Sequence, residues 1–135
     1  MTIPRLYNLP TIDINSIMTI AERGDLPFTV KRIYWITSNQ KDEIRGEHAH
    51  KSCQQLLVCL HGELNIGLED IDGNKSTFQL RNPNEMILIP SQYWCKIEYK
   101  KDAIVLVMAS QEYDANDYIR NYDVFKSQEL KLNLG

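Results

Sequence analysis

The chain lacks several features that mark common classes of protein. Its three cysteines are odd in number and form no C-x-x-C pair, which is typical of reduced, buried thiols and not of a disulfide framework. They are Cys53, Cys59 and Cys95. The longest uninterrupted apolar run, residues 103–109, is too short to cross a bilayer, and the first residues contain no apolar stretch of signal-peptide length. We therefore expect a soluble, cytoplasmic protein without a membrane partner.

An excess of positive charge is also lacking. The 15 lysines and arginines are scattered along the chain and are outnumbered by 18 aspartates and glutamates, giving a formal net charge of −3. This pattern argues against a nucleic-acid-binding surface. With 135 residues, 43% of them hydrophobic, and no linker or repeat, the sequence predicts a single domain spanning residues 1–135.

Helical periodicity is missing before residue 110, and alternating apolar and polar residues predict strands instead. The predicted strands lie at residues 28–36, 54–60, 64–68, 78–80, 86–89, 95–99 and 103–109. His61-Gly62 is expected to end the second strand, Asp70–Asn74 to form a hairpin turn, and Lys100–Asp102 to separate the last two strands. Short strands with turn signals between them indicate an all-β sandwich or barrel.

Two segments do not follow the strand pattern. The tail from Asp114 to Gln128 is the best candidate for a helix or helical turn. The stretch from Ile12 to Glu22 is compatible with either a short helix or an extended arm, and the sequence leaves both open.

The segment from Arg45 to Lys51 carries His48 and His50, just ahead of the apolar run at 54–60. In a strand, residues i and i+2 face the same side, so the two imidazoles are expected to point together. Such a pair can hold a metal or transfer protons; the ordinary alternative, which stays open, is that one histidine packs in the core and the other lies at its rim. The third histidine, His61, precedes a turn glycine and is expected at the surface.

Other candidates have ordinary alternatives. Arg32 and Tyr34 share a strand face, and Tyr93 and Trp94 follow Pro90, where a barrel mouth is expected. Each of these side chains would also be compatible with sheet packing or a solvated charge. Several inward polar groups on strands otherwise rich in valine, isoleucine and leucine nevertheless favour a binding site, because buried polar groups need partners.

The histidine spacing resembles the first motif of the cupins, which are small jelly-roll barrels. His48 and His50 are followed by Gln55 and Gly62 at the motif's intervals, and the second motif aligns with Pro90, Gln92 and Cys95. Two metal positions of that motif therefore depart from the pattern, because Gln55 replaces a glutamate and Cys95 replaces a histidine. An amide is a poor substitute for a carboxylate ligand. Zinc held by His48, His50 and Cys95 stays an alternative, but we predict a site without metal or cofactor, in which the imidazoles act as general base and acid.

The resemblance extends beyond the cupins in general. It is carried by Arg32–Ile36, Arg45–Lys51, Gln54–Leu57 and Asp117–Phe125. These motifs resemble the sugar 3,4-ketoisomerases that act on dTDP-4-keto-6-deoxyglucose, the WxcM-like group, over residues 5–127. The resemblance implies a cupin-type jelly roll with a short C-terminal helical segment. It also implies conversion of the 4-keto sugar to a 3-keto isomer through an enediol, without metal or organic cofactor.

The resemblance also implies roles for individual residues. Tyr34, His48 and His50 match the catalytic tyrosine and histidines of the group. The first histidine moves the proton between carbons 3 and 4, and the other two side chains assist at the sugar oxygens. Arg45 looks placed to bind or orient the substrate, and Arg32, Trp94 and Gln55 are further predicted substrate-binding residues.

Members of the group are dimers that can exchange N-terminal strands, so we expect a homodimer in which residues 1–25 or so are exchanged. The product feeds an aminotransferase that leads to 3-amino sugars of surface polysaccharides. The galacto configuration at carbon 4 is slightly favoured by its prevalence. Two alternatives stay open: a non-catalytic sugar-binding cupin, and a dTDP-sugar epimerase, whose His–Asp constellation is not found in the sequence.

Overall fold

The structure, a computed structural model, describes residues 2–38 and 42–134, with side chains as far as residue 128. Its strands are β1 (Arg5–Asn8), β2 (Thr11–Ile14), β3 (Ser16–Thr19), β4 (Arg32–Thr37), β5 (Ile44–His50), β6 (Gln55–Glu69), β7 (Lys75–Leu80), β8 (Glu85–Ile89), β9 (Trp94–Ala109) and β10 (Tyr118–Ile119). Its helical segments are η1 (Arg23–Asp25), η2 (Ala115–Asp117) and α1 (Tyr122–Leu134). The prediction of an all-β fold with a C-terminal helical segment is confirmed.

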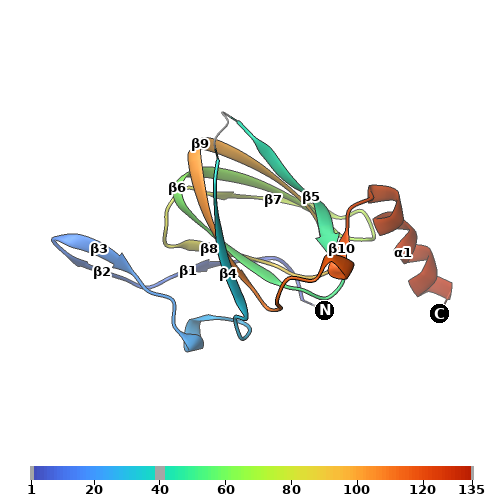
Figure 1. The fold of residues 1–135 in the computed structure, drawn as a ribbon, viewed down its shortest axis with the longest axis horizontal. Coiled ribbons are helices and arrows are strands. Elements are labelled where there is room, and N and C mark those ends of the chain that lie inside the picture. The colour runs from blue at the N-terminus through green and yellow to red at the C-terminus, as the bar shows by residue number, and fades with distance from the viewer. Residues whose placement is uncertain (1, 39–41, 135) are drawn as a thin grey trace.

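The two longest strands, β6 and β9, pair along most of their length and organise the main sheet (Figure 1). At one end of the β6–β9 pair, β8 lies beside β6 and β4 lies beside β9. At the other end β7 lies beside β6 and β5 lies beside β9. The pairing register shifts between Cys59 and Glu63, where the long strands bend. Each long strand therefore contributes one half to each of two packed layers, as in a jelly roll.

The bend depends on backbone conformations that few residues adopt. Gly62 has φ of +77°, and a Cβ at this position would lie 2.6 Å from the carbonyl oxygens of Lys100 and Lys101. On β9, Lys101 and Asp102 are also left-handed, with φ of 57° and 56°. These residues form bulges within continuous strands. The predictions that one strand ends at His61-Gly62, and that two strands are separated at 100–102, are therefore wrong.

The core lies between the two layers, and a second cluster covers one of them from outside. Leu57 and Cys59 point into the inner core, whereas Leu56 and Val58 join the outer cluster. The prediction that the run 54–60 is covered on both faces is thus confirmed for these four residues. The outer cover consists of Leu9, Leu26, Phe28 and Val30, among others. Because residues 28 and 30 pack in this cover, β4 begins at Arg32 and not at Phe28 as predicted.

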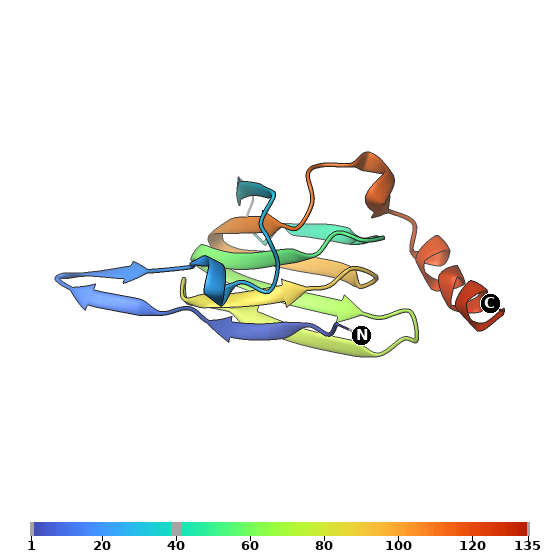
Figure 2. The same cartoon turned by 90° about the horizontal axis from the view of Figure 1, so that it is seen from below.

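The N-terminal segment forms an arm and not a helix. Strands β2 and β3 pair as an antiparallel hairpin that projects from the rest of the chain (Figures 1 and 2). Four large apolar side chains on the hairpin are exposed: Ile12, Ile14, Ile17 and Met18. This hairpin decides between the two possibilities that the sequence left open for residues 12–22.

The C-terminal segment is only partly helical. Asp114 caps η2, then β10 pairs with Ala49 and His50 of β5, and the α-helix begins at Tyr122. The predicted helix or helical turn over 114–128 is therefore found at residues 115–117 and from residue 122 on, with β10 between the two. Helix α1 is anchored by Phe125, which packs with Ala49 and Ile119. No helix in the described part of the chain is long and apolar enough to span a bilayer.

Candidate active site

A cavity of about 270 Å³ lies between the two layers and is lined by side chains of β4, β5, β6, β9 and β10. Five predicted site residues line it: Arg32, Tyr34, Arg45, His48 and Gln55. His50 lies beside it, in a smaller space that shares Arg32, Gln55 and Tyr118 with the main cavity. The fold thus brings together six of the seven predicted residues, which are far apart in the sequence.

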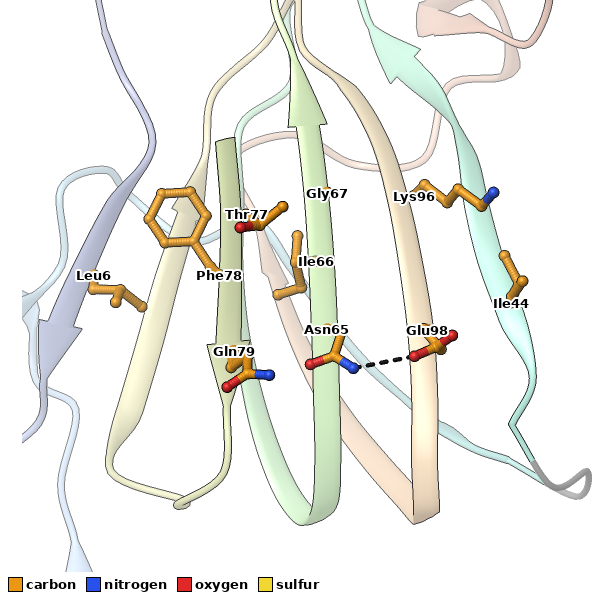
Figure 3. A pocket seen from close by; sticks show the side chains of 10 residues that line it. All are labelled: Leu6, Ile44, Asn65, Ile66, Gly67, Thr77, Phe78, Gln79, Lys96 and Glu98. Carbon is orange, nitrogen blue, oxygen red and sulfur yellow. Dashed lines mark hydrogen bonds between the residues drawn. The ribbon is translucent and has the colours of Figure 1, made fainter. Parts of the chain in front are cut away.

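A larger open groove, of about 710 Å³, lies along β6, β7 and β9 (Figure 3). Its lining includes Asn65 and Glu98, which are joined by a hydrogen bond of 3.1 Å, together with Thr77 and Gln79. It contains no histidine or tyrosine. Because the groove offers few groups for acid–base chemistry, we place the candidate site in the smaller cavity.

His48 is positioned by a β-bulge in β5. The pairing with β9 shifts between Gly46 and His48, and Glu47 is left-handed with φ of 49°. The His48 Nδ1 atom lies 2.8 Å from the Gly46 carbonyl oxygen. Since a carbonyl only accepts, Nδ1 must carry the proton, which leaves a lone pair on Nε2. Burial lowers the pKa of His48 and outweighs this hydrogen bond, so the ring is neutral near pH 7.

His50 is paired with a carboxylate from the C-terminal segment. Its Nδ1 atom lies 3.0 Å from Oδ2 of Asp117, and both residues are buried. Its Nε2 atom is buried and makes no hydrogen bond with any part of the chain that the structure describes. Burial lowers the pKa of His50 and outweighs the opposite effect of Asp117. The ring centroids of His48 and His50 are 5.1 Å apart, as expected for residues on one strand face.

Tyr34 and Gln55 form a second pair in the cavity. The Gln55 side-chain amide donates a hydrogen bond of 3.0 Å to the Tyr34 hydroxyl. The phenol therefore acts as acceptor towards Gln55 and keeps its own proton for another partner. Burial raises the pKa of Tyr34, so that it stays protonated near neutral pH. The pair presents a proton donor to the same cavity that His48 lines.

Three guanidinium groups surround the cavity. Arg32 lies over the ring of Tyr34 at 4.4 Å, and Arg120 lies over the ring of Tyr118 at 4.3 Å. Arg45 forms an ion pair of 3.2 Å with Glu43. Cations and aromatic faces together suit an anionic ligand that also carries a flat ring.

Trp94 is the one predicted residue that the structure places elsewhere. It is half-buried against Tyr122 and Phe125 of α1, with ring centroids 5.4 and 5.8 Å away. It belongs to the cluster that anchors the helix and does not line the cavity. Because Trp94 comes just after the turn that follows Pro90, the sequence predicts it near the mouth of the barrel. In the structure, α1 packs against its ring.

The residues that the sequence reasoning missed come mainly from the C-terminal segment. Asp117 holds His50, and Tyr118 and Arg120 line the cavity. Their motif carried the family resemblance, but no role was assigned to them. The sequence does not reveal the His50–Asp117 pair, because 67 residues separate the two side chains and the pairing of β10 with β5 brings them together.

The donor set does not fit the cupin metal. The Gln55 amide donates to Tyr34 and replaces a carboxylate ligand, and burial raises the pKa of the Cys95 thiol to about 12, which disfavours the thiolate form that binds a metal. Within the described residues, His50, Cys53 and Asp117 offer ligand atoms within 4.8 Å of one another. The Asp117 carboxylate, however, already accepts hydrogen bonds from Ser52, Cys53 and His50. We therefore derive no step through a metal.

The half-buried imidazole of His48 and the phenol of Tyr34 thus lie at one cavity of a jelly roll. The family described as "WxcM-like, C-terminal", FdtA, matches residues 2–129. The chain belongs to this family and is an isomerase.

Individual relatives are similar over nearly their whole length. The chain is 38% identical over 121 residues to TDP-4-oxo-6-deoxy-α-D-glucose-3,4-oxoisomerase of Aneurinibacillus thermoaerophilus, covering 88% of this chain and 86% of the relative. It is 34% identical to a variant of the 3,4-ketoisomerase QdtA of Thermoanaerobacterium thermosaccharolyticum, solved with TDP-4-keto-6-deoxyglucose, with a TM-score of 0.88 and coverages of 98% and 97%. It is 29% identical to WlaRA, the TDP-fucose-3,4-ketoisomerase of Campylobacter jejuni, with a TM-score of 0.85 and coverages of 93% and 94%.

Proposed function

We propose that the protein converts dTDP-4-keto-6-deoxyglucose into a dTDP-3-keto-6-deoxyhexose. The observation that carries the proposal is the cavity in which a lone pair on His48 Nε2 and the free hydroxyl proton of Tyr34 are available together. The names of the relatives supply the substrate class, since each acts on a TDP-linked sugar.

The reaction moves a carbonyl group by one carbon. The base removes the proton from carbon 3, which is acidic because it lies next to the carbon-4 carbonyl. The electron pair forms the carbon–carbon double bond of an enediol, and oxygen 4 takes up a proton. In the second half of the reaction, the hydroxyl group at carbon 3 loses its proton and carbon 4 receives a proton, which leaves the carbonyl group at carbon 3. Atoms and electrons balance without an external oxidant or a cofactor.

Three side chains carry these steps. His48 is the base that transfers the proton between carbons 3 and 4, because its free Nε2 is set by the bulge at Gly46. Tyr34 donates a proton or a hydrogen bond at a sugar oxygen, and His50 assists at the other oxygen. A neutral His48 at pH 7 is the form that a base requires.

Binding is assigned to the polar groups around the reacting atoms. Arg32 and Arg45 line the cavity and suit the negative charge of the diphosphate. Gln55 orients the Tyr34 hydroxyl and offers its carbonyl oxygen to the sugar. The substrate-binding role predicted for Trp94 is not part of this proposal, because this residue packs against α1.

We further propose the galacto configuration at carbon 4, which requires that the enediol be reprotonated from the corresponding face of the sugar. The 3-keto product is then a substrate for an aminotransferase that forms a 3-amino-3,6-dideoxy sugar of a surface polysaccharide. We place this reaction in the cytoplasm. Neither a membrane nor a nucleic acid takes part.

The same proposal includes a homodimer of single-domain subunits that exchange their N-terminal segments, about residues 1–25. A two-stranded hairpin alone is only marginally stable in water. The β2–β3 hairpin nevertheless exposes large apolar side chains, with Ile14 at 73% and Ile17 at 69% exposure. Trp35 on β4, a strand that pairs with β9 alone among the described strands, is 67% exposed as well. A second copy that covers the hairpin would bury this surface.

The decisive experiment is incubation of the purified protein with dTDP-4-keto-6-deoxyglucose, followed by proton NMR of the sugar. The proposal expects a new 3-keto sugar whose carbon-4 proton shows the small coupling constants of the galacto form. A change of configuration at carbons 3 or 5 without movement of the carbonyl would identify an epimerase instead. Binding without turnover would identify a sugar-binding cupin.

A further inference from the structure

Behind His50 lies a carboxylate that takes no direct part in the proposed proton transfer. Asp117 reaches His50 from η2, a segment 67 residues away in the sequence. Oδ2 of Asp117 accepts a hydrogen bond of 3.0 Å from His50 Nδ1, and both side chains are less than 10% exposed. A pair of this kind, fully enclosed and adjoining the cavity, needs a physical explanation.

The Asp117 carboxylate accepts hydrogen bonds from three residues. Oδ1 accepts from the backbone nitrogen of Ser52 at 2.9 Å and from its hydroxyl at 2.7 Å. Oδ2 accepts from the backbone nitrogen of Cys53 at 3.1 Å in addition to His50. Burial raises the pKa of Asp117, but these hydrogen bonds together outweigh it and hold the pKa below its usual range. The carboxylate is therefore ionised and can only accept.

An accepting carboxylate fixes the tautomer of its histidine. Because Asp117 cannot donate, the proton of neutral His50 must be on Nδ1, and Nε2 must carry the lone pair. Nε2 is buried and has no hydrogen-bond partner among the described residues. Buried polar atoms normally have partners, so an unpaired one beside a cavity indicates a ligand group. His50 borders the small space that shares Arg32, Gln55 and Tyr118 with the main cavity.

We propose that Asp117 is a positioning residue, which holds His50 with its proton on Nδ1 so that Nε2 accepts a hydrogen bond from a substrate hydroxyl. This inference rests on the proposed function and adds a residue to it. The charged and titratable groups around His50 are Arg32 of β4, His48 of β5, Cys53, and Asp117, Tyr118 and Arg120 of the C-terminal segment.

A purely structural role is the competing explanation. Through Ser52, Asp117 also ties the C-terminal segment to the turn that follows β5. Replacing Ser52 with alanine removes the hydroxyl that donates to Oδ1 and leaves the His50 contact in place. Asp70 offers a matched control, since its carboxylate likewise caps backbone and side-chain donors, but in the β6–β7 turn.

The first measurement is nitrogen-15 NMR of the imidazoles in the wild-type protein, with the His50 signals assigned from a His50→Asn variant. We expect a protonated Nδ1 and an unprotonated Nε2 at neutral pH. A proton on Nε2 would overturn the inference. This result does not depend on activity, so it stands even if the assay with the sugar nucleotide shows that the proposed function is wrong.

The second measurement compares the kinetics of three variants. Asp117→Asn should lower kcat about tenfold or more while KM changes by less than about threefold, because only the orientation of a group that acts during turnover is lost. Ser52→Ala should lower Tm but keep most of kcat, and Asp70→Asn should leave kcat unchanged. An unchanged kcat in folded Asp117→Asn, or equal losses in Asp117→Asn and Ser52→Ala, would show a structural role only. If Asp117→Asn does not fold, the NMR result decides.

Discussion

At the scale of single residues, the chemistry depends on how His48 is held. Its Nδ1 proton is bound by the Gly46 carbonyl, so Nε2 is the basic atom. His48→Asn should keep the fold and nucleotide binding, yet lower kcat by about 10²–10⁴-fold, the usual contribution of a positioned general base. His50→Asn and Tyr34→Phe should lose less, because in the proposed mechanism these side chains assist at the sugar oxygens.

The matched control is His61→Asn, which changes the remaining histidine at an exposed position in the β6 bulge. It should have wild-type activity. Steady-state kinetics of all four variants, together with circular dichroism to verify folding, gives the comparison. A folded His48→Asn variant within about threefold of the wild type would mean that another group is the base.

The lowered pKa values of the two histidines predict two kinds of pH dependence. Because burial keeps His48 neutral, the acid limb of kcat/KM should have its midpoint below the usual histidine value of 6.5. Both imidazoles bind protons more readily in the unfolded chain, since the folded pKa is lowered. The contribution of these two histidines to the free energy of unfolding should therefore be fully present above pH 6.5 and should fall as the pH drops below that value. Thermal melts across this range and a pH–rate profile test both, and a midpoint above 6.5 would contradict the assigned environment.

How well the sequence predicts each site residue depends on how far apart in the sequence that residue and its contacts lie. Tyr34 and His48 follow from alternation on single strands and from the family motifs. Asp117 does not, because its role arises only when a two-residue strand brings it to His50. Trp94 was misplaced for a related reason: the sequence contains no sign that α1 folds back over it.

At the scale of elements, alternation locates the strands but not their bends. A bulge keeps strand pairing on both sides of an irregular residue, so a turn-like dipeptide such as His61-Gly62 looks the same whether the strand ends or bends there. The strand boundaries near residue 32 were missed because Phe28 and Val30 continue the apolar alternation as part of the outer cover. The helix boundary was missed because β10 interrupts a polar, weakly patterned segment.

The bulge of β5 provides a test at this scale. Gly46 has φ of +91°, and an added Cβ would lie 2.9 Å from the Cys95 carbonyl oxygen. Gly46→Ala should cost about 1–2 kcal/mol or more in stability, as left-handed backbone does for other residues. It should also lower kcat, because the carbonyl that binds His48 shifts. Gly24→Ala is the control, since nothing lies within 4 Å of its added Cβ. If Gly46→Ala and Gly24→Ala have the same Tm and the same kcat, the bulge does not contribute to stability or to the position of His48.

At the scale of the whole molecule, the donor set predicts independence from metal. Gln55, which replaces a carboxylate ligand, is engaged with Tyr34, and burial raises the pKa of the Cys95 thiol to about 12, which disfavours the thiolate that a metal needs. Activity should therefore survive exhaustive treatment with EDTA, and the purified protein should contain no stoichiometric zinc or iron by elemental analysis. Loss of activity on chelation that is restored by added metal would require a mechanism different from the one proposed.

The exposed hairpin predicts the assembly. In the proposed dimer a second copy covers its apolar side chains, so light scattering at micromolar concentration should give about twice the chain mass of 15.7 kDa. Ile14→Asp combined with Ile17→Asp should shift the mass towards the monomer, because two charges cannot be buried without partners. Val124→Asp, at an exposed apolar position on α1 instead of the hairpin, should stay dimeric. A wild-type monomer would show that the hairpin is not covered by a second copy, and a dimer of the double variant would place the interface elsewhere.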